Sequence, residues 1–426
     1  MGEAQPLVRI AIGDIKTAQK ALEGQRRKAS GKGRITRSVV YETFEKWLYI
    51  EDRRRIDIKL ATAITRKMKE QDGGTSIWLI EVGPSGGGKN EEILAFENPK
   101  TTKTIHSFTP RALISGLKKE GVSDLAPKLK DKLILIPDFS QLMKLHPNAK
   151  AQVWAQLRDL FDGRAGKQTG SGVDRTYSDI RTTLIGGVTP LFDHEFLIHQ
   201  NLGSRELIWR YEIKDKEALM QKALANEGKE EEMRKELRET VNRFLDEVEI
   251  FDKPVPKRIE QKLKEYAKWL SKMRAPAEYD WKGRELRSDI VPEEPTRVLK
   301  QLKRLFVALK SLSPDYTDER ALDVLKHLVD SSGFPNRIKV FKQIEQEPKK
   351  TREIVDELRL GYDTVLKELN ALWNLGLIDR EVREEEVCGR TREVKYWSLK
   401  KPKQISLGHP NEFKCPHCAC FFFFGE

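Results

Sequence analysis

Three short runs of apolar residues stand out along a chain that is otherwise rich in polar positions. They are SIWLIEV (76–82), KLILIPD (132–138) and TTLIGGV (182–188). A short continuous apolar run predicts a strand that is buried on both faces of a parallel sheet. Between the second and third runs, AQVWAQLRDLF (151–161) has the apolar spacing of an amphipathic helix. Strands that alternate with helices in this way predict an α/β layer fold.

The pattern changes on either side of these runs. Residues 41–69 have apolar positions at helical spacing and predict helices that lead into the first strand. After residue 211 the chain becomes charged and helical, and it includes a predicted helix pair at 296–312 and 317–329. Residues 336–399 predict three helices followed by two strands. A helix-turn-helix with a two-stranded wing is the order of a winged-helix domain.

The charge of the chain adds a weak indication of its partners. The 426 residues include 78 Lys and Arg against 66 Asp and Glu, a formal charge of +12. Such an excess favours a polyanionic partner such as DNA, RNA or a nucleotide, although a surplus that only aids solubility would look the same. No apolar run approaches the roughly 20 residues that cross a bilayer, and the N-terminus lacks a signal-peptide pattern. We therefore expect a cytoplasmic protein with no membrane partner.

The first apolar run leads into a glycine-rich loop. Gly83, four further residues and then Gly88-Lys89 give the spacing of a phosphate-binding loop. In such a loop the backbone N–H groups face the phosphates, and the lysine reaches the terminal ones. The strand before the loop and the helix expected after it favour this interpretation over a tight turn without a ligand. The expected nucleotide-binding residues are Gly83, Pro84, Ser85, Gly86, Gly87, Gly88, Lys89, Asn90 and Glu91.

The metal side of this predicted site departs from the usual pattern. Asn90 stands where a Ser or Thr hydroxyl normally holds the magnesium ion, and its amide oxygen is a ligand that Mg²⁺ accepts. The second apolar run ends in Pro137-Asp138, with one carboxylate where two are usual. Asp138 fits either the metal-holding or the water-activating position. The sequence therefore predicts ATP with Mg²⁺ at Asn90 and Asp138, and leaves hydrolysis open.

Together with three further short sequence motifs (boxes), these features make residues 76–312 resemble the AAA+ ATPases, and within them the minichromosome-maintenance-like branch. LIGGVTP (184–190) looks like the strand whose tip carries a polar sensor residue, which implies that role for Thr189. LGSRELIW (202–209) is similar to the box that bears the arginine finger, here Arg205. EPTRVLKQLKRLFVAL (294–309) looks like the lid helix with its sensor arginine, here Arg297. Ordinary surface ion pairs are the alternative for both arginines.

The resemblance implies an architecture and an assembly. The fold would be a P-loop AAA+ three-layer α/β core with a helical lid, and arginines from a neighbouring subunit would complete the nucleotide site of a ring, commonly a hexamer. The boxes also resemble those of ATPases carried by phages and mobile genetic elements. The expected parts are a basic flexible arm (1–40), the nucleotide-binding core (41–211), the lid (212–332), a winged-helix domain (333–400) and a cysteine-containing tail (401–426).

Two places are candidates for contact with DNA. In minichromosome-maintenance-like ATPases, the position of the glycine-rich segment 162–177 holds a hairpin that touches DNA in the pore; a plain loop is the alternative. The predicted recognition helix and the basic wing suit base edges and phosphates. Three glutamates at 384–386 oppose this, and docking to a protein is the alternative. The candidate DNA contacts are Arg164, Lys167, Arg175, Tyr362, Lys367, Arg383, Arg390 and Arg392.

The tail contains KCPHCAC, which places Cys415, Cys418 and Cys420 close together. A CxxC pair is half of a zinc site, and a complete site needs a second pair of ligands. Binding of Zn²⁺ and a redox-sensitive tail without metal are the two interpretations.

Three functions are consistent with these patterns. The first is a ring-forming, helicase-like motor or loader that hydrolyses ATP during DNA replication of a genome or mobile element. The second is a nucleotide-gated DNA-binding switch, such as an initiator or transcription regulator, with little or no hydrolysis. The third is a defence or signalling ATPase whose winged helix binds a protein.

Overall fold

The computed structural model describes residues 34–68, 75–107, 113–114, 124–169, 173–193, 205–280, 286–387 and 390–400. These residues form two compact units, one within Met1–Pro276 and Val291–Phe334, the other within Ala277–Ile290 and Pro335–Glu426. In the part of the chain that is described, no helix is long and apolar enough to span a membrane.

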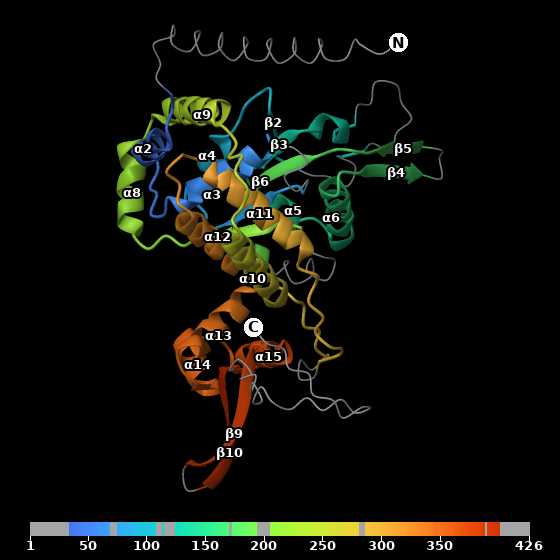
Figure 1. The fold of residues 1–426 in the computed structure, drawn as a ribbon, viewed down its shortest axis with the longest axis vertical. Helices are drawn as coiled ribbons and strands as arrows, with labels where there is room; N and C mark the ends of the chain where they lie inside the picture. Colours follow the sequence, from blue (N-terminus) through green and yellow to red (C-terminus); the bar gives the residue numbers. More distant parts are fainter. Residues whose placement is uncertain are drawn as a thin grey trace, which may run out of the picture. The chain divides into compact units, whose positions relative to one another are not determined.

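The first unit is built on a five-stranded sheet, drawn in Figure 1. All neighbouring strands are parallel, in the order β2-β3-β6-β1-β7. The three predicted apolar runs form β1, β3 and β6, which confirms the α/β class. The strands are β1 (Trp78–Val82), β2 (Thr102–Thr104), β3 (Lys132–Ile136), β6 (Thr182–Val188) and β7 (Leu207–Arg210).

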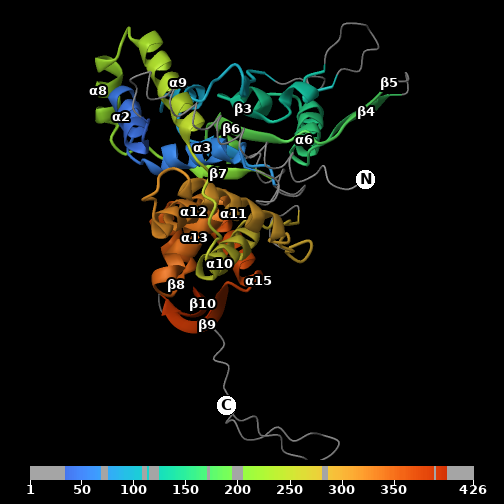
Figure 2. The same cartoon turned by 45° about the horizontal axis from the view of Figure 1, so that its top comes forward.

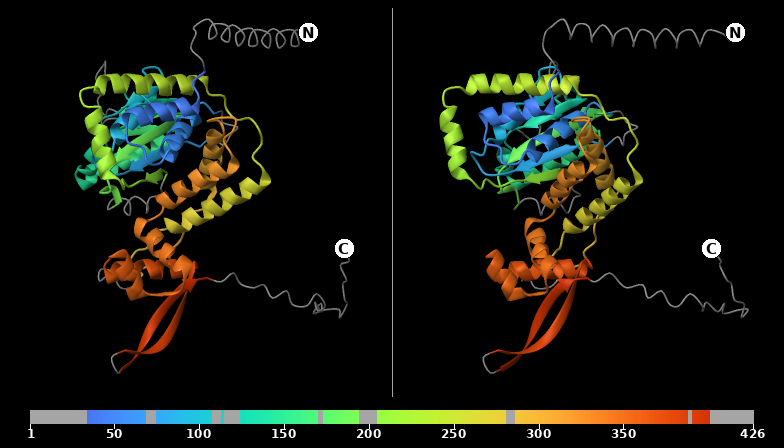
Figure 3. Two further views of the ribbon diagram at one scale, coloured as in Figure 1. Left: turned by 90° about the vertical axis from the view of Figure 1, so that its left-hand side faces the viewer. Right: turned by 60° about the vertical axis from the view of Figure 1, so that its left-hand side comes forward.

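Helices cover both faces of the sheet. Alternate strand residues belong to two separate apolar cores; Leu79 packs in one with α2, α3 and α9–α12, and Ile80 packs in the other with α5 and α6. Burial on both faces explains why the strands are continuously apolar. Figure 3 shows α8 and α9 running along the outer side of α2 and α3.

The helices of this unit include the pair predicted at 296–312 and 317–329, observed as α11 and α12. They are α2 (Arg37–Trp47), α3 (Arg54–Thr65), α4 (Lys89–Leu94), η2 (Ala126–Leu129), α5 (Ser140–Met143), α6 (Pro147–Phe161), α8 (Lys216–Ala225), α9 (Glu230–Glu247), α10 (Lys257–Met273), α11 (Thr296–Lys310) and α12 (Asp318–Ser332).

A separate two-stranded hairpin follows α6. It consists of β4 (Ala165–Thr169) and β5 (Val173–Tyr177), which pair antiparallel. The hairpin projects from the sheet beyond α6, as Figure 2 shows. It occupies the glycine-rich segment that the sequence analysis singled out.

The described residues of the second unit form three helices and a three-stranded antiparallel sheet in the order β8-β10-β9. Its core contains Val365, Leu369 and Leu372 from the third helix and the fully buried Trp397 from the last strand. The elements are α13 (Pro335–Gln346), β8 (Lys349–Lys350), α14 (Thr351–Leu358), α15 (Tyr362–Asn374), β9 (Ile378–Val387) and β10 (Arg390–Leu399).

Candidate functional site

The glycine-rich loop joins the carboxyl end of β1 to the start of α4. Gly88 caps α4 with φ of 82°, a left-handed conformation that glycine adopts without a steric penalty. Gly83 is required for a different reason, since a Cβ atom there would lie 2.2 Å from the Tyr211 ring. The loop backbone is therefore held in a shape that other residues at these two positions would disturb.

Parallel pairing brings the ends of three strands to this same edge. Asp138 follows β3 and Thr189 follows β6, while β6 lies between β1 and β3 in the sheet. After β1 the chain crosses to β2 at one edge of the sheet and then adds β3 and β6 in turn, so that β6 lies beside β1. The next strand, β7, pairs with the other side of β1 and forms the opposite edge of the sheet. A reversal of this kind opens a crevice at the carboxyl ends of the strands, where ligands of α/β proteins bind.

The loop and these strand ends surround one cavity of about 530 Å³. The structure thereby brings together every predicted nucleotide-binding position from 85 to 91 with Asp138 and Thr189. Sequence reasoning did not anticipate Ser140 and Lys144, which belong to α5 and its C-terminal cap. The lining residues are Ser85, Gly86, Gly87, Gly88, Lys89, Asn90, Glu91, Pro137, Asp138, Ser140, Lys144, Gly187, Val188 and Thr189.

Lys89 is 7% exposed and lies against the loop itself. Its ammonium group donates hydrogen bonds to the carbonyl oxygens of Gly83, at 2.8 Å, and Pro84. Burial lowers the pKa of Lys89 below its ordinary value, with Arg55 adding to the shift and Glu81 opposing it. The side chain is thus held beside the cavity by two neutral backbone acceptors.

Two side chains of this cavity carry oxygen atoms of the kinds that bind magnesium. Asn90 is exposed, and so is Asp138, whose carboxylate accepts a hydrogen bond from the Ser140 backbone N–H at 2.8 Å. Glu91 also lines the cavity, but its carboxylate pairs with Arg234 of α9, with 2.7 Å between the Oε1 and Nη2 atoms. A neutral amide and a carboxylate are ligands that Mg²⁺ accepts.

A second cavity, of about 400 Å³, flanks the loop. Tyr211 and Ile213 line it, and both also contact Gly87, whose carbonyl accepts a hydrogen bond from the Tyr211 hydroxyl at 3.2 Å. The rest of the lining is polar and comes from the α2–α3 connection, the first two residues of α3, the end of β7 with the residues after it, and α12. It consists of Tyr49, Glu51, Asp52, Arg54, Arg55, Arg210, Glu212, Lys214 and His327.

The two predicted catalytic arginines lie at the opposite edge of the sheet. Arg205 lies just before β7, and its Nη2 atom is 2.7 Å from Oδ2 of Asp162. Arg297, in the first turn of α11, pairs with Glu293 at 3.3 Å. Asp162 and Arg297 line a cavity of about 440 Å³ at the amino ends of β1 and β6. The cationic residues of that lining are Arg164, Arg181, Arg297 and Lys300.

The hairpin carries the first group of DNA candidates. Lys167 and Arg175 are cross-strand neighbours in register, and Arg164 is exposed just before β4. Arg175 pairs with the buried carboxylate of Asp124 at 3.0 Å, and the Lys167 ammonium lies 3.4 Å from the Ile114 carbonyl oxygen. Arg175, in the middle of β5, therefore has a structural contact with its own chain.

The second unit carries the remaining DNA candidates. Tyr362, the first residue of α15, is 52% exposed, but the Lys367 ammonium lies 5.5 Å from the centroid of the Tyr279 ring. Arg383 pairs with Glu381 at 2.8 Å. Arg390 and Arg392 lie in β10, and their side chains fall outside the described part of the chain.

The unit also has an exposed aromatic group that the sequence reasoning missed. Trp373 is 40% exposed, and the Arg380 guanidinium lies 4.4 Å from the centroid of its ring.

The predicted zinc ligands Cys415, Cys418 and Cys420 lie outside the described residues. Among the residues that are described, no group of three or more His, Cys, Asp or Glu side chains is arranged to hold a metal ion.

Comparisons with known proteins add little. No protein-family model matches this chain, and no curated protein matches its sequence. One similar solved structure is titled "The A form apo structure of NrS-1 C terminal region-CTR". It has 10% sequence identity and a TM-score of 0.25, over 86% of this chain and 77% of that chain. A similarity this low carries no weight for fold or function, so the function of this chain rests on its own residues.

Proposed function

We propose that this chain is an AAA+ ATPase that binds ATP with Mg²⁺ and acts on DNA as a ring-forming, helicase-like motor or loader in the replication of a genome or mobile element. One observation carries the proposal. The phosphate-type loop, Asp138 and Thr189 surround a single cavity at the carboxyl edge of a parallel sheet. Two sequence motifs and a polar strand tip thus converge on the place where such sheets bind ligands.

Each side chain of the cavity has a role in this proposal. Backbone N–H groups of the loop and the Lys89 ammonium would bind the phosphates, and Thr189 would contact the terminal one. Asn90 and Asp138 would hold Mg²⁺, which neutralises the charge that develops on the transferred phosphate. Lys144, from the same cavity, would add a second positive charge. The adjoining cavity beside Tyr211 would take the base.

The position of Arg205 and Arg297 supports assembly into a ring. Both lie at the amino edge, away from the loop of their own chain. An arginine that stabilises phosphoryl transfer is often supplied by a neighbouring molecule. In a ring, commonly a hexamer, the amino edge of one subunit would face the carboxyl edge of the next.

The DNA-binding part of the proposal assigns residues 41–211 to the core, 212–332 to the lid and 333–400 to a winged helix. Exposed Tyr362 and the Trp373–Arg380 stack offer aromatic and cationic surface to a nucleic acid. Lys167 and Arg164 of the hairpin would contact phosphates. The internal ion pairs of Arg175 and Arg383 make these two weaker candidates.

The test is ATP hydrolysis by the purified chain, with and without DNA, beside Lys89→Ala and Asp138→Ala. We expect turnover that DNA stimulates and that both substitutions abolish. ATP binding without turnover above the Lys89→Ala background would exclude the motor.

A nucleotide-gated DNA-binding switch is the second candidate, and two observations favour it. Asn90 replaces the usual hydroxyl, and Glu91 is neutralised by Arg234, which leaves Asp138 as the remaining carboxylate in the cavity lining. If the chain is a switch, Asn90→Thr should raise hydrolysis from background, whereas in a motor that tolerates Asn90 the same substitution should change turnover only slightly.

A further inference from the structure

Four buried charges lie directly beneath the loop. Arg55 and Lys59, one turn apart on α3, each contact both Glu81 and Glu92. Arg55 lies 3.2 Å from Glu81 and 2.5 Å from Glu92, and Lys59 lies 2.7 Å and 2.5 Å from the same two carboxylates. At most 3% of any of these side chains is exposed. The cluster is therefore a closed, neutral set of two cations and two anions.

The two carboxylates of the cluster bracket the loop. Glu81 belongs to β1 and lies two residues before Gly83, whereas Glu92 belongs to α4 and lies three residues after Lys89. The same two cations thus bind the strand before the loop and the helix after it. Fixing the two ends of a short loop restricts the directions in which its backbone N–H groups point.

Arg55 also supports the centre of the loop. Its guanidinium lies 3.5 Å from the centroid of the Tyr211 ring. That ring fills the space beside Gly83, and its hydroxyl donates a hydrogen bond to the Gly87 carbonyl oxygen at 3.2 Å. One side chain of α3 therefore contacts the strand end, the helix start and the aromatic group that supports the loop.

Stability alone is a poor explanation for such a cluster. Buried ion pairs lose about as much in desolvation as they gain in attraction, and apolar replacements are often neutral or stabilising. Burial would raise the pKa of Glu81, but Lys59 and Arg55 hold its pKa below the ordinary value, so this carboxylate stays charged. Charged groups with defined partners fix one geometry in a way that apolar contacts do not.

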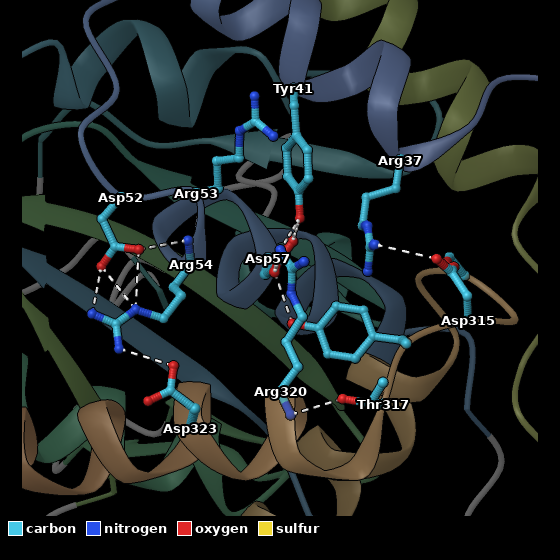
Figure 4. A network of polar contacts seen from close by, with 12 residues as sticks. Arg37, Tyr41, Asp52, Arg53, Arg54, Asp57, Asp315, Thr317, Arg320 and Asp323 are labelled. Carbon is cyan, nitrogen blue, oxygen red and sulfur yellow. Dashed lines mark hydrogen bonds and ion pairs between the residues drawn. The ribbon is translucent and has the colours of Figure 1, made fainter.

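The opposite side of α3 is anchored separately, as Figure 4 shows. Asp57 is fully buried and accepts hydrogen bonds from the hydroxyls of Tyr41 and Tyr316 and from the Arg320 guanidinium. These partners come from α2, from the residues before α12 and from α12 itself. Loss of the Asp57 contacts would loosen α3 against these elements without touching the loop.

We propose that Arg55 and Lys59 are positioning residues that hold the phosphate-binding loop in its binding conformation. The inference rests on the proposed nucleotide site. Neither side chain lines the phosphate cavity, whereas Arg55 also lines the adjoining cavity that the proposed function assigns to the base, so loop exchange measured without ATP is the readout that separates positioning from direct contact. Arg55 acts through Glu81, Glu92 and Tyr211 and does not contact the phosphates.

The test compares two buried ionic clusters of one helix. Arg55→Met and Arg55→Lys alter the cluster beneath the loop, and Asp57→Asn alters the other side of α3 as the matched control. The paired variant Arg55→Met with Glu92→Met covers the case in which Arg55→Met alone fails to fold, since it removes a charge of each sign. We would measure ATP affinity by fluorescent-analogue binding and amide hydrogen exchange of residues 83–88 without ATP.

We expect Arg55→Met and the paired variant to weaken ATP binding by about 10–100-fold, the size found for outer partners of metal ligands. Exchange at residues 83–88 should accelerate with them, Arg55→Lys should give an intermediate result, and Asp57→Asn should change neither readout. Unchanged loop exchange in the Arg55 variants, or an equal effect of Asp57→Asn, would overturn the inference. If the unaltered chain binds no ATP, the proposed function fails, while loop exchange still decides whether Arg55 positions the loop.

Discussion

The carboxyl and amino edges of the parallel sheet both collect polar groups, but the groups differ in kind. The carboxyl edge offers loop backbone and the ammonium of Lys89 around a cavity of about 530 Å³. The amino edge offers guanidinium groups, including those of Arg181 and Arg297, around a cavity of about 440 Å³. The first edge resembles a binding site for phosphate, whereas the second is a set of guanidinium groups, of which Arg181, Arg205 and Arg297 pair with carboxylates of the same chain.

The length of the strands keeps the side chains of the two edges apart within one chain. β1 contains five residues, and at about 3.3 Å per residue it separates the edges by roughly 16 Å. Under the proposed function, the two edges are complementary halves of a site that only a second subunit completes. The predictions below test this division.

The largest expected effect is on turnover when the amino edge is altered. Arg205→Ala and Arg297→Ala should each lower ATP turnover by about 10³-fold or more, the contribution of an arginine finger, and leave ATP affinity unchanged. Steady-state hydrolysis and equilibrium binding measure the two quantities. Asp162→Asn, which removes the partner of Arg205, is the control and should have a far smaller effect.

Assemblies that mix two variants test whether Lys89 and Arg205 act on the same nucleotide from different subunits. Lys89→Ala subunits mixed with Arg205→Ala subunits should regain turnover that neither has alone, because some interfaces then pair an intact lysine with an intact arginine. A mixture as inactive as its components would show that both residues serve the same edge.

The next effect concerns the backbone of the carboxyl edge. Gly83→Ala would place a Cβ atom 2.2 Å from the Tyr211 ring, so either the loop or the ring must move. We expect a loss of about 1–3 kcal/mol in the free energy of unfolding, as for other overpacked positions. Urea unfolding measures this loss, and in a Tyr211→Ala background the same Gly83→Ala substitution should cost less, because the clashing ring is gone. A Gly83→Ala chain of undiminished stability would mean that the loop is not held as tightly as the contact implies.

A pH dependence distinguishes the ammonium of one edge from the guanidinium groups of the other. Because burial lowers the pKa of Lys89, its ammonium is lost at a lower pH than that of an ordinary lysine. Under the proposed function ATP binding needs that ammonium, so affinity should fall as pH rises through the lowered pKa, by up to about tenfold per pH unit. Binding measured from pH 7.5 to 10 tests this. Lys89→Arg keeps its charge and should bind without the decline, whereas a decline shared by both proteins would assign it to another group.

The sequence predicted the centre of the sheet better than its β2 edge. β1, β3 and β6 are buried on both faces, so each is a continuous apolar run. β2, at the edge of the sheet, has the sequence TKT and no apolar residue. An edge strand of three residues is held by backbone pairing with β3, which leaves no pattern in its side chains.

In the candidate site, too, one part was predictable from the sequence and another part was not. The sequence predicted the loop from its glycine spacing together with the strand before it and the helix after it, because all of these residues are consecutive in the chain. The contacts that support it come from Arg55 and Tyr211, which only folding brings to Gly83 and Gly87. One local signal was present, since Glu81 is a charged residue inside a buried apolar strand, and such a charge requires a partner.

The smallest effect expected concerns the hairpin near the amino edge. Lys167→Ala should weaken DNA binding by less than about tenfold and reduce the slope of log affinity against log salt by about one, as for a single phosphate contact. ATP affinity should not change, because Lys167 does not line the carboxyl-edge cavity. Binding to one DNA duplex at several salt concentrations measures the slope, and Lys300→Ala, at the amino-edge cavity, is the matched control. An unchanged slope for Lys167→Ala with a reduced slope for Lys300→Ala would move DNA contact from the hairpin to the amino edge. That edge would then have a ligand of its own, and the division between the two edges would no longer hold.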